Sequence, residues 1–134
     1  MDITTEYPAS EVAVITLAGE LDGSNFEQVI DAGRTARDSG AQRIVMDLTG
    51  LSYMGSSGLV AIHSIALILA GQEPTSPEDG WQAIHEVTQS VEGGPGVILA
   101  GPQPAVERVL VRSGMVGLFP VHPDRETALG AAAV

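Results

Sequence analysis

One stretch in the first half of the chain decides the expected fold: Asp47-Leu48-Thr49-Gly50-Leu51-Ser52-Tyr53-Met54-Gly55-Ser56-Ser57-Gly58-Leu59. It follows the apolar residues 44–46 and precedes a very apolar segment, so we interpret it as the end of a buried strand, a tight loop and the start of a helix. Ser56 and Ser57 then lie where the first backbone N–H groups of the helix have no partner within it. Such a position favours an anion, including one made by phosphorylating a hydroxyl.

The residues before this stretch predict a β-hairpin, a helix and a strand. Residues 11–19 are rich in β-branched side chains and predict a strand that pairs with an earlier one near residues 3–7. Ser24, with Glu27 three residues later, has the spacing of a capping box and predicts a helix that ends near Gly40. Residues 44–46 predict a short strand, apolar enough for the centre of a sheet.

The residues after this stretch continue the alternation of helices and strands. The predicted elements are the apolar helix 59–70, a buried strand 96–100, a helix 104–112 that begins at Pro104, an edge strand 118–121 and a last helix 125–133 with Asp124 as its cap. This order predicts an α/β layered domain with a mixed sheet. We expect helix 59–70 to be buried in the core, with a partner or the segment around Trp81 as the alternative cover.

The length and composition favour one globular domain, residues 1–134, with an acidic insertion at residues 72–95. That insertion is either a tolerated surface loop or a functional one. There are 17 acidic residues against 6 basic ones, all arginine, and the net charge is −11. We therefore expect neither nucleic acid nor an anionic membrane as a partner. The acidity favours a basic protein partner or serves solubility alone.

Several other classes of protein are not favoured. The chain has no cysteine, so a disulfide framework or a thiolate site is excluded. It has no lysine, so it has no phosphate-binding loop of the nucleotide-hydrolase kind. His63, His85 and His122 are scattered, and we expect no metal site, no cofactor and no catalytic residues, hence no enzyme. No signal peptide or spanning segment is recognisable, and we expect a cytoplasmic protein.

The order of these motifs resembles the STAS domain, and more narrowly the bacterial anti-sigma factor antagonists. The resemblance is carried by Gly19-Glu20-Leu21-Asp22, by residues 47–59 and by the later run from Gly101 to Met115. It covers nearly all of the chain except residues 72–95. It implies a single layered domain with a mixed central sheet and helices packed mainly on one face.

The resemblance also implies a function. Such a domain binds an anti-sigma factor that is also a serine kinase, loses that binding when a serine is phosphorylated, and is restored by a phosphatase. The phosphorylated serine maps to Ser56, with Ser57 as the second candidate. The expected partner-binding residues are Asp22, Gly55, Ser56, Ser57 and Gly58, and Asp47 is the expected supporting acid near the loop.

Gly55 departs from the family pattern, which has an aspartate immediately before the phosphorylated serine. Its absence removes a charge that a kinase could recognise and makes the backbone more flexible. Two alternatives therefore stay open beside the phosphorylation switch. One is a constitutive interaction or scaffold subunit without kinase control, and the other is a sensor that holds a nucleotide or phosphate at the helix end. For the serines themselves, the alternative role is plain helix capping.

Overall fold

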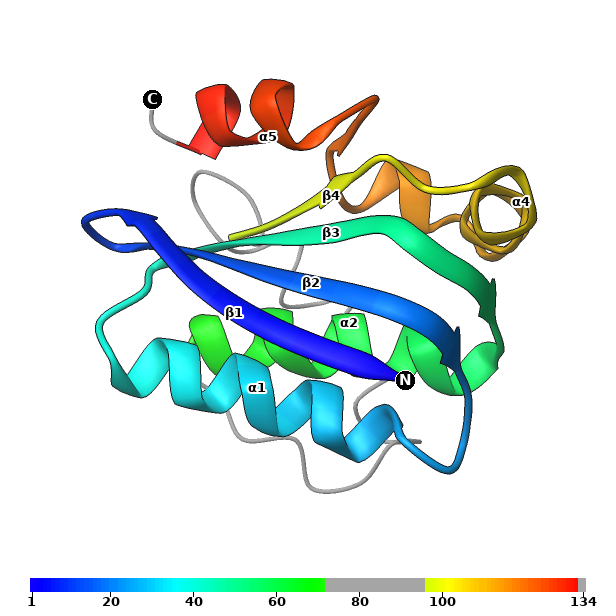
Figure 1. Ribbon diagram of the computed structural model, residues 1–134, viewed down its shortest axis with the longest axis horizontal. Coiled ribbons are helices and arrows are strands. Elements are labelled where there is room, and N and C mark those ends of the chain that lie inside the picture. Colours follow the sequence, from blue (N-terminus) through cyan, green and yellow to red (C-terminus); the bar gives the residue numbers. More distant parts are fainter. Residues whose placement is uncertain (72–95, 133–134) are drawn as a thin grey trace.

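The computed structural model describes residues 1–71 and 96–132 (Figure 1). Its elements are β1 (Asp2–Ala9), β2 (Val12–Leu21), α1 (Phe26–Asp38), β3 (Arg43–Met54), α2 (Ser56–Leu69), β4 (Val97–Ala100), α4 (Pro104–Ser113), the 3-10 turn η1 (Met115–Gly117), β5 (Val121–His122) and α5 (Arg125–Ala132). The predicted hairpin and helices are present, and so are the strands, except that the edge strand predicted at 118–121 is Val121–His122, because Pro120 precedes the strand and does not belong to it. The predicted acidic insertion, with Trp81, lies outside the described residues.

The strands form one five-stranded sheet in the order β1-β2-β3-β4-β5. β1 and β2 are antiparallel, while β2, β3, β4 and β5 are parallel, which confirms a mixed sheet. β3 is central, as its apolar start predicts, and β5 follows Pro120 at the edge of the sheet. Parallel neighbours end at the same side of the sheet, so the loops that follow β2 and β3 are brought together.

Most of the helical surface covers one face of the sheet (Figure 1). α1 and α2 pack there against Ile15, Leu17, Ile44 and Met46. α5 lies on the opposite face, where Val14, Val45 and Ile98 meet its buried alanines. This is the expected single layered α/β domain with helices mainly on one face. The larger core contributes the following fully buried side chains: Ile15, Leu17, Leu21, Ile44, Met46, Leu48, Leu51, Met54, Ile62, Ile65 and Phe119.

Helix α2 is buried along most of its length. All of its residues from Ala61 to Ile68 are buried, including the polar His63 and Ser64. The His63 ring packs edge-on against Phe119, with 5.6 Å between the ring centroids. The uniformly apolar character of this segment therefore reflects burial, as expected for a helix without a polar face.

The loop expected between the predicted strand 44–46 and the predicted helix 59–70 is wrong. β3 continues through it to Met54, and Gly55 alone separates the strand from α2. The polar residues do not end the strand, because irregularities in its pairing with β2 absorb them. The Asp47 carboxylate also accepts hydrogen bonds from the backbone N–H and the hydroxyl of Thr49, at 3.1 and 2.7 Å.

Candidate functional site

The start of α2 is held against the end of β2. The N–H of Gly55 donates to the carbonyl of Leu21 at 3.0 Å, and the N–H of Gly58 donates to the carbonyl of Gly55 at 3.0 Å. Ser56 and Ser57 are the first two residues of the helix. These bonds fix the first turn of α2 relative to the sheet, so both serines stand on a rigid support.

Neither serine caps α2. Gly55 occupies the cap position in an extended conformation, and no side chain makes a cap hydrogen bond. Ser56 is exposed, and its hydroxyl forms no hydrogen bond with any part of the chain that the structure describes. Ser57 is half-buried beside Gly23, where a Cβ would lie 3.5 Å from the Ser57 Oγ. The capping alternative is thus wrong, and the Ser56 hydroxyl is available to another molecule.

Gly58 is buried, so it supports the site from within. A Cβ at this position would overlap Met54 Cγ and lie 2.8 Å from Met54 Sδ and 3.0 Å from Leu21 Cδ2. The two Met54 contacts are closer than real Cβ atoms approach, and the Leu21 contact would need a small shift of its neighbour. Gly58 is therefore the residue that lets α2 begin directly against the ends of β2 and β3.

Tyr53 is a site residue that the sequence reasoning missed. Its side chain is half-exposed, and its hydroxyl would lie 3.3 Å from a Cβ at Gly55. The phenol thus stands over the position where the family carries an aspartate. The signal was the strand period itself, which puts Tyr53 on the opposite side of β3 from the buried Met54. An acid at position 55 would have to share this space with the ring.

Asp22 lies in the neighbouring loop, between β2 and α1. Its carboxylate accepts hydrogen bonds from the Ser24 hydroxyl at 2.5 Å and from the Ser24 N–H at 2.9 Å. These bonds hold the pKa of the Asp22 carboxyl below its ordinary value, with the hydroxyl as the main cause. Its own N–H donates to the Asn25 side chain at 3.0 Å. Asp22 therefore gives this end of the sheet a fixed negative charge.

The capping box predicted for the start of α1 is wrong. The Ser24 hydroxyl is bonded to Asp22 and caps nothing, and α1 begins one residue after Asn25. The Asn25 side chain instead reaches back and donates to the carbonyl of Glu20 at 2.8 Å. The residues expected to start a helix thus shape the loop beside Ser57.

The structure brings Asp22 to the start of α2 but not Asp47. Leu21 pairs with Met54, and Gly23 borders Ser57, so the loop that carries Asp22 is adjacent. Asp47 pairs with Thr16, five residues before Leu21 on β2. At the rise of an extended strand this is a separation of about 16 Å. Asp47 is also buried and bonded to Thr49, so its place is in the strand.

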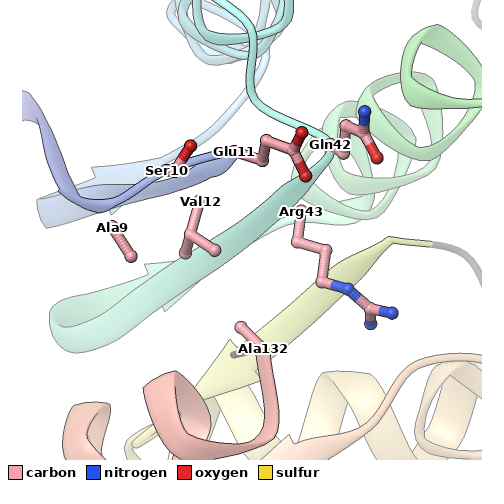
Figure 2. Close-up of a pocket in the computed structure, with 7 residues that line it drawn as sticks. All are labelled: Ala9, Ser10, Glu11, Val12, Gln42, Arg43 and Ala132. Carbon is pink, nitrogen blue, oxygen red and sulfur yellow. The ribbon is translucent and has the colours of Figure 1, made fainter. Parts of the chain in front are cut away.

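Two hollows of the described surface lie at the opposite end of the sheet. One, of about 450 Å³, is near the turn between β1 and β2 (Figure 2). Its lining residues are Ala9, Ser10, Glu11, Val12, Gln42, Arg43 and Ala132. A second, of about 330 Å³, shares part of this lining. Neither is lined by Ser56 or Ser57, so neither offers a nucleotide pocket at the start of α2.

Residues 1–71 and 96–132 contain neither a metal-binding cluster nor a spanning helix. No group of three or more histidine, aspartate or glutamate side chains is placed to hold a metal ion. No helix there has both the length and the apolar character to cross a membrane.

The comparison with protein families identifies the fold. The family model described as "Mlab, STAS domain" matches residues 6–75, more than half of the chain. The chain therefore belongs to the STAS domain family.

The similar proteins are anti-sigma factor antagonists. The putative anti-sigma factor antagonist BtrV of Bordetella bronchiseptica is 29% identical over 118 residues, which cover 88% of this chain and 84% of BtrV. An anti-sigma factor antagonist from Mycobacterium paratuberculosis has a TM-score of 0.67 at 22% identity, covering 99% of this chain and 96% of that one. The phosphorylated form of the Bacillus cell fate determinant SpoIIAA has a TM-score of 0.56 at 25% identity, covering 97% and 98%. The chain thus has the fold of the anti-sigma factor antagonists.

Proposed function

We propose that this STAS domain is a regulatory binding module that acts as an anti-sigma factor antagonist. It binds an anti-sigma factor that is also a serine kinase, and phosphorylation of Ser56 releases the complex. The observation that carries the proposal is the exposed Ser56 hydroxyl, unbonded within the described chain, on the first residue of a rigidly held helix. The name of BtrV and the phosphorylated state of the solved SpoIIAA support it.

The proposed switch acts on the partner and leaves the fold intact. A phosphate adds a charge of roughly −1.5 to −2 near neutral pH. At the N-terminus of α2 the unpaired N–H groups and the helix dipole favour this charge, so the domain tolerates it. A partner seated on Ser56 would instead have to desolvate the phosphate and face its charge. Asp22 adds to that negative potential from the adjacent loop.

Gly55 is compatible with this switch. Its extended backbone is one that any residue adopts, and its N–H bond to Leu21 does not depend on a side chain. The absent aspartate changes what a kinase reads next to Ser56, and Tyr53 is the side chain that takes up the space. The kinase partner of this chain is therefore one that accepts a phenol in place of a carboxylate. A phosphatase would return the chain to its binding state.

The test uses purified serine-kinase anti-sigma factors from the genome that encodes this chain, each incubated with the chain and ATP. We expect phosphate to be incorporated into the wild type but not into Ser56→Ala. Ser57→Ala is the matched control and should be labelled like the wild type. Mass spectrometry maps the modified residue. Ser56→Asp should retain the fold and bind the unmodified partner at least about tenfold more weakly, the effect of about 1.4 kcal/mol.

Two results would count against the proposal. Equal labelling of Ser56→Ala and wild type would mean that Ser56 is not the acceptor. Tight binding without any labelling, unaffected by Ser56→Asp, would favour the constitutive scaffold subunit instead.

A further inference from the structure

One face of α4 carries two arginines and is continued by an apolar residue of the following turn. Arg108, Val111 and Arg112 are exposed and follow one another at helical spacing, and Val116 in η1 is exposed just beyond them. Val111 and Val116 are 56% and 44% exposed, among the few large apolar side chains left in water. We call these four residues the α4 surface. The apolar residues α4 needs for its own packing, Val106 and Leu110, are buried on its other side.

The two arginines of the α4 surface make no side-chain interaction with the described residues. Neither Arg108 nor Arg112 forms a hydrogen bond or an ion pair with the described part of the chain. Three other arginines are used internally: Arg34 pairs with Asp31, Arg37 with Asp38 and Arg125 with Glu6. In a chain of net charge −11, with 17 acidic side chains against 6 basic ones, these two arginines lie one helical turn apart and the internal ion pairing of the described residues does not use them.

The α4 surface belongs to the same end of the molecule as Ser56. α4 packs against β3, and the Gln103 side chain just before it donates to the carbonyl of Thr49 at 2.8 Å. β3 continues from Thr49 to Met54 and leads into α2 through Gly55. Figure 1 shows α4 beside the end of the sheet at which α2 begins. A protein seated on Ser56 is therefore in a position to reach α4.

The direction of the proposed switch restricts the charge of the partner. A basic surface opposite Ser56 would bind more tightly once a phosphate was added, because opposite charges attract. The cost of desolvating the phosphate opposes binding in every case, and release is strongest where the facing surface is acidic or apolar. An acidic partner is repelled by the overall charge of −11, so its approach needs a local attraction. Arg108 and Arg112 are placed to supply that attraction.

We propose that the α4 surface is a second docking contact for the protein that binds at Ser56, and that it takes an acidic segment with an apolar residue at its centre. The carboxylates meet Arg108 and Arg112, and the apolar residue covers Val111. This inference rests on the proposed function. It differs from the expectation of a basic partner, which was based on composition. Here the partner is acidic like this chain as a whole, and its charge is opposite only to that of the α4 arginines.

The experiment measures the association rate constant of the chain with the serine-kinase anti-sigma factor that phosphorylates it in the test above, in low and high salt. We expect Arg108→Glu with Arg112→Glu to lower that rate about tenfold or more at low salt, the lower end of electrostatic steering. The difference should vanish at about 1 M NaCl, where charges are screened beyond about 3 Å. Arg108→Lys with Arg112→Lys should keep a rate close to the wild type.

A matched control separates the α4 surface from general charge. Arg43 lies at the opposite end of the sheet, near the hollow in Figure 2, and also forms no ion pair with the described residues. Arg43→Glu makes the same charge change as Arg112→Glu, and we expect it to alter the association rate less than about twofold. Equal urea midpoints of the variants would show that the fold is unchanged.

The outcomes distinguish this inference from the proposed function. If the α4 variants bind like the wild type while Ser56→Asp releases the partner, the α4 contact is wrong and the proposed function stands. If the α4 variants weaken binding while Ser56→Asp does not, the docking contact stands and the switch is wrong. If the α4 variants and the wild type sediment differently in the absence of any partner, a second copy of the chain occupies the α4 surface and the docking contact is wrong. If the wild type binds no serine-kinase anti-sigma factor, both the proposed function and the docking contact are wrong.

Discussion

The Ser56 hydroxyl is available for chemistry because a glycine, and not a serine, occupies the cap position of α2. Serine at the start of a helix usually accepts a bond from a backbone N–H of the first turn. Here that turn is anchored instead by the backbone of Gly55 and Leu21. Residue preference alone could not predict this difference, because the bond that replaces the cap comes from a residue more than thirty positions earlier in the sequence.

Gly58 is packed so closely that one added methyl group should destabilise the fold. We expect Gly58→Ala to lower the free energy of unfolding by about 1–3 kcal/mol, the usual cost of an extra methyl in a packed core. The added Cβ would press on Met54 and Leu21, which are both buried. Urea denaturation followed by circular dichroism measures the change.

The matched control for this prediction is Gly130→Ala in α5, where a Cβ would meet nothing within 4 Å. That substitution should stabilise the chain by about 0.5–1 kcal/mol, the ordinary gain from alanine in a helix. Equal effects at both positions would show that the close approach at Gly58 is not real.

Asp22 gives a prediction about pH. Its pKa is held below the ordinary 3.8 mainly by the Ser24 hydroxyl, so Ser24→Ala should raise it toward that value. Because the folded pKa is depressed, the associated stability is present above pH 3.8 and is lost as the pH falls through the folded pKa. NMR titration of the side-chain carboxyl measures the shift.

Asp124 serves as the internal reference for that titration. Its pKa is also lowered, chiefly by the Thr127 N–H at the start of α5. Ser24→Ala should leave it unchanged. If the Asp22 titration does not move, the Ser24 bond is not the cause of the shift.

Secondary-structure elements were predictable where local chemistry decides them. Pro104 does begin α4, Gly114 ends it in a left-handed conformation, and the Asp124 carboxylate caps α5 by accepting from the Thr127 N–H at 2.8 Å. The end of β3 was not predictable, because the polar residues after Met46 are typical of a loop. Pairing with β2 on one side and the Asp47–Thr49 bonds carry the strand through them.

Gly33 sets how closely α1 packs on α2, and the effect of replacing it can be measured. A Cβ at Gly33 would lie 2.6 Å from Ile65 Cγ1, so the glycine sets how closely the two helices approach. We expect Gly33→Ala to cost about 1–3 kcal/mol of unfolding free energy, measured by urea denaturation. In an Ile65→Ala background the same change should cost clearly less, because the clashing atoms are gone. Additive effects would contradict the contact.

At the scale of the molecule, the candidate site is assembled by sheet topology. Parallel β2 and β3 end side by side, so Asp22 and Gly23 meet the start of α2, and α4 joins the same end through Thr49. The sequence placed Ser56 on the helix start but could not show that Asp47 lies about 16 Å away, since that depends on how far β3 extends. It also treated the charge as a total and did not single out the two exposed arginines that α4 places one turn apart.

The net charge of −11 should make the stability of the domain depend on salt. Repulsion among the excess carboxylates opposes folding, while the described ion pairs, all at the surface, contribute only about 0–1 kcal/mol each. Raising NaCl from about 10 to about 150 mM shortens the screening length from roughly 30 to 8 Å, so repulsion should weaken more than pairing. We therefore expect the urea midpoint to rise with salt and then level off. KCl should act identically, and a midpoint that falls would mean that the surface ion pairs outweigh the net charge.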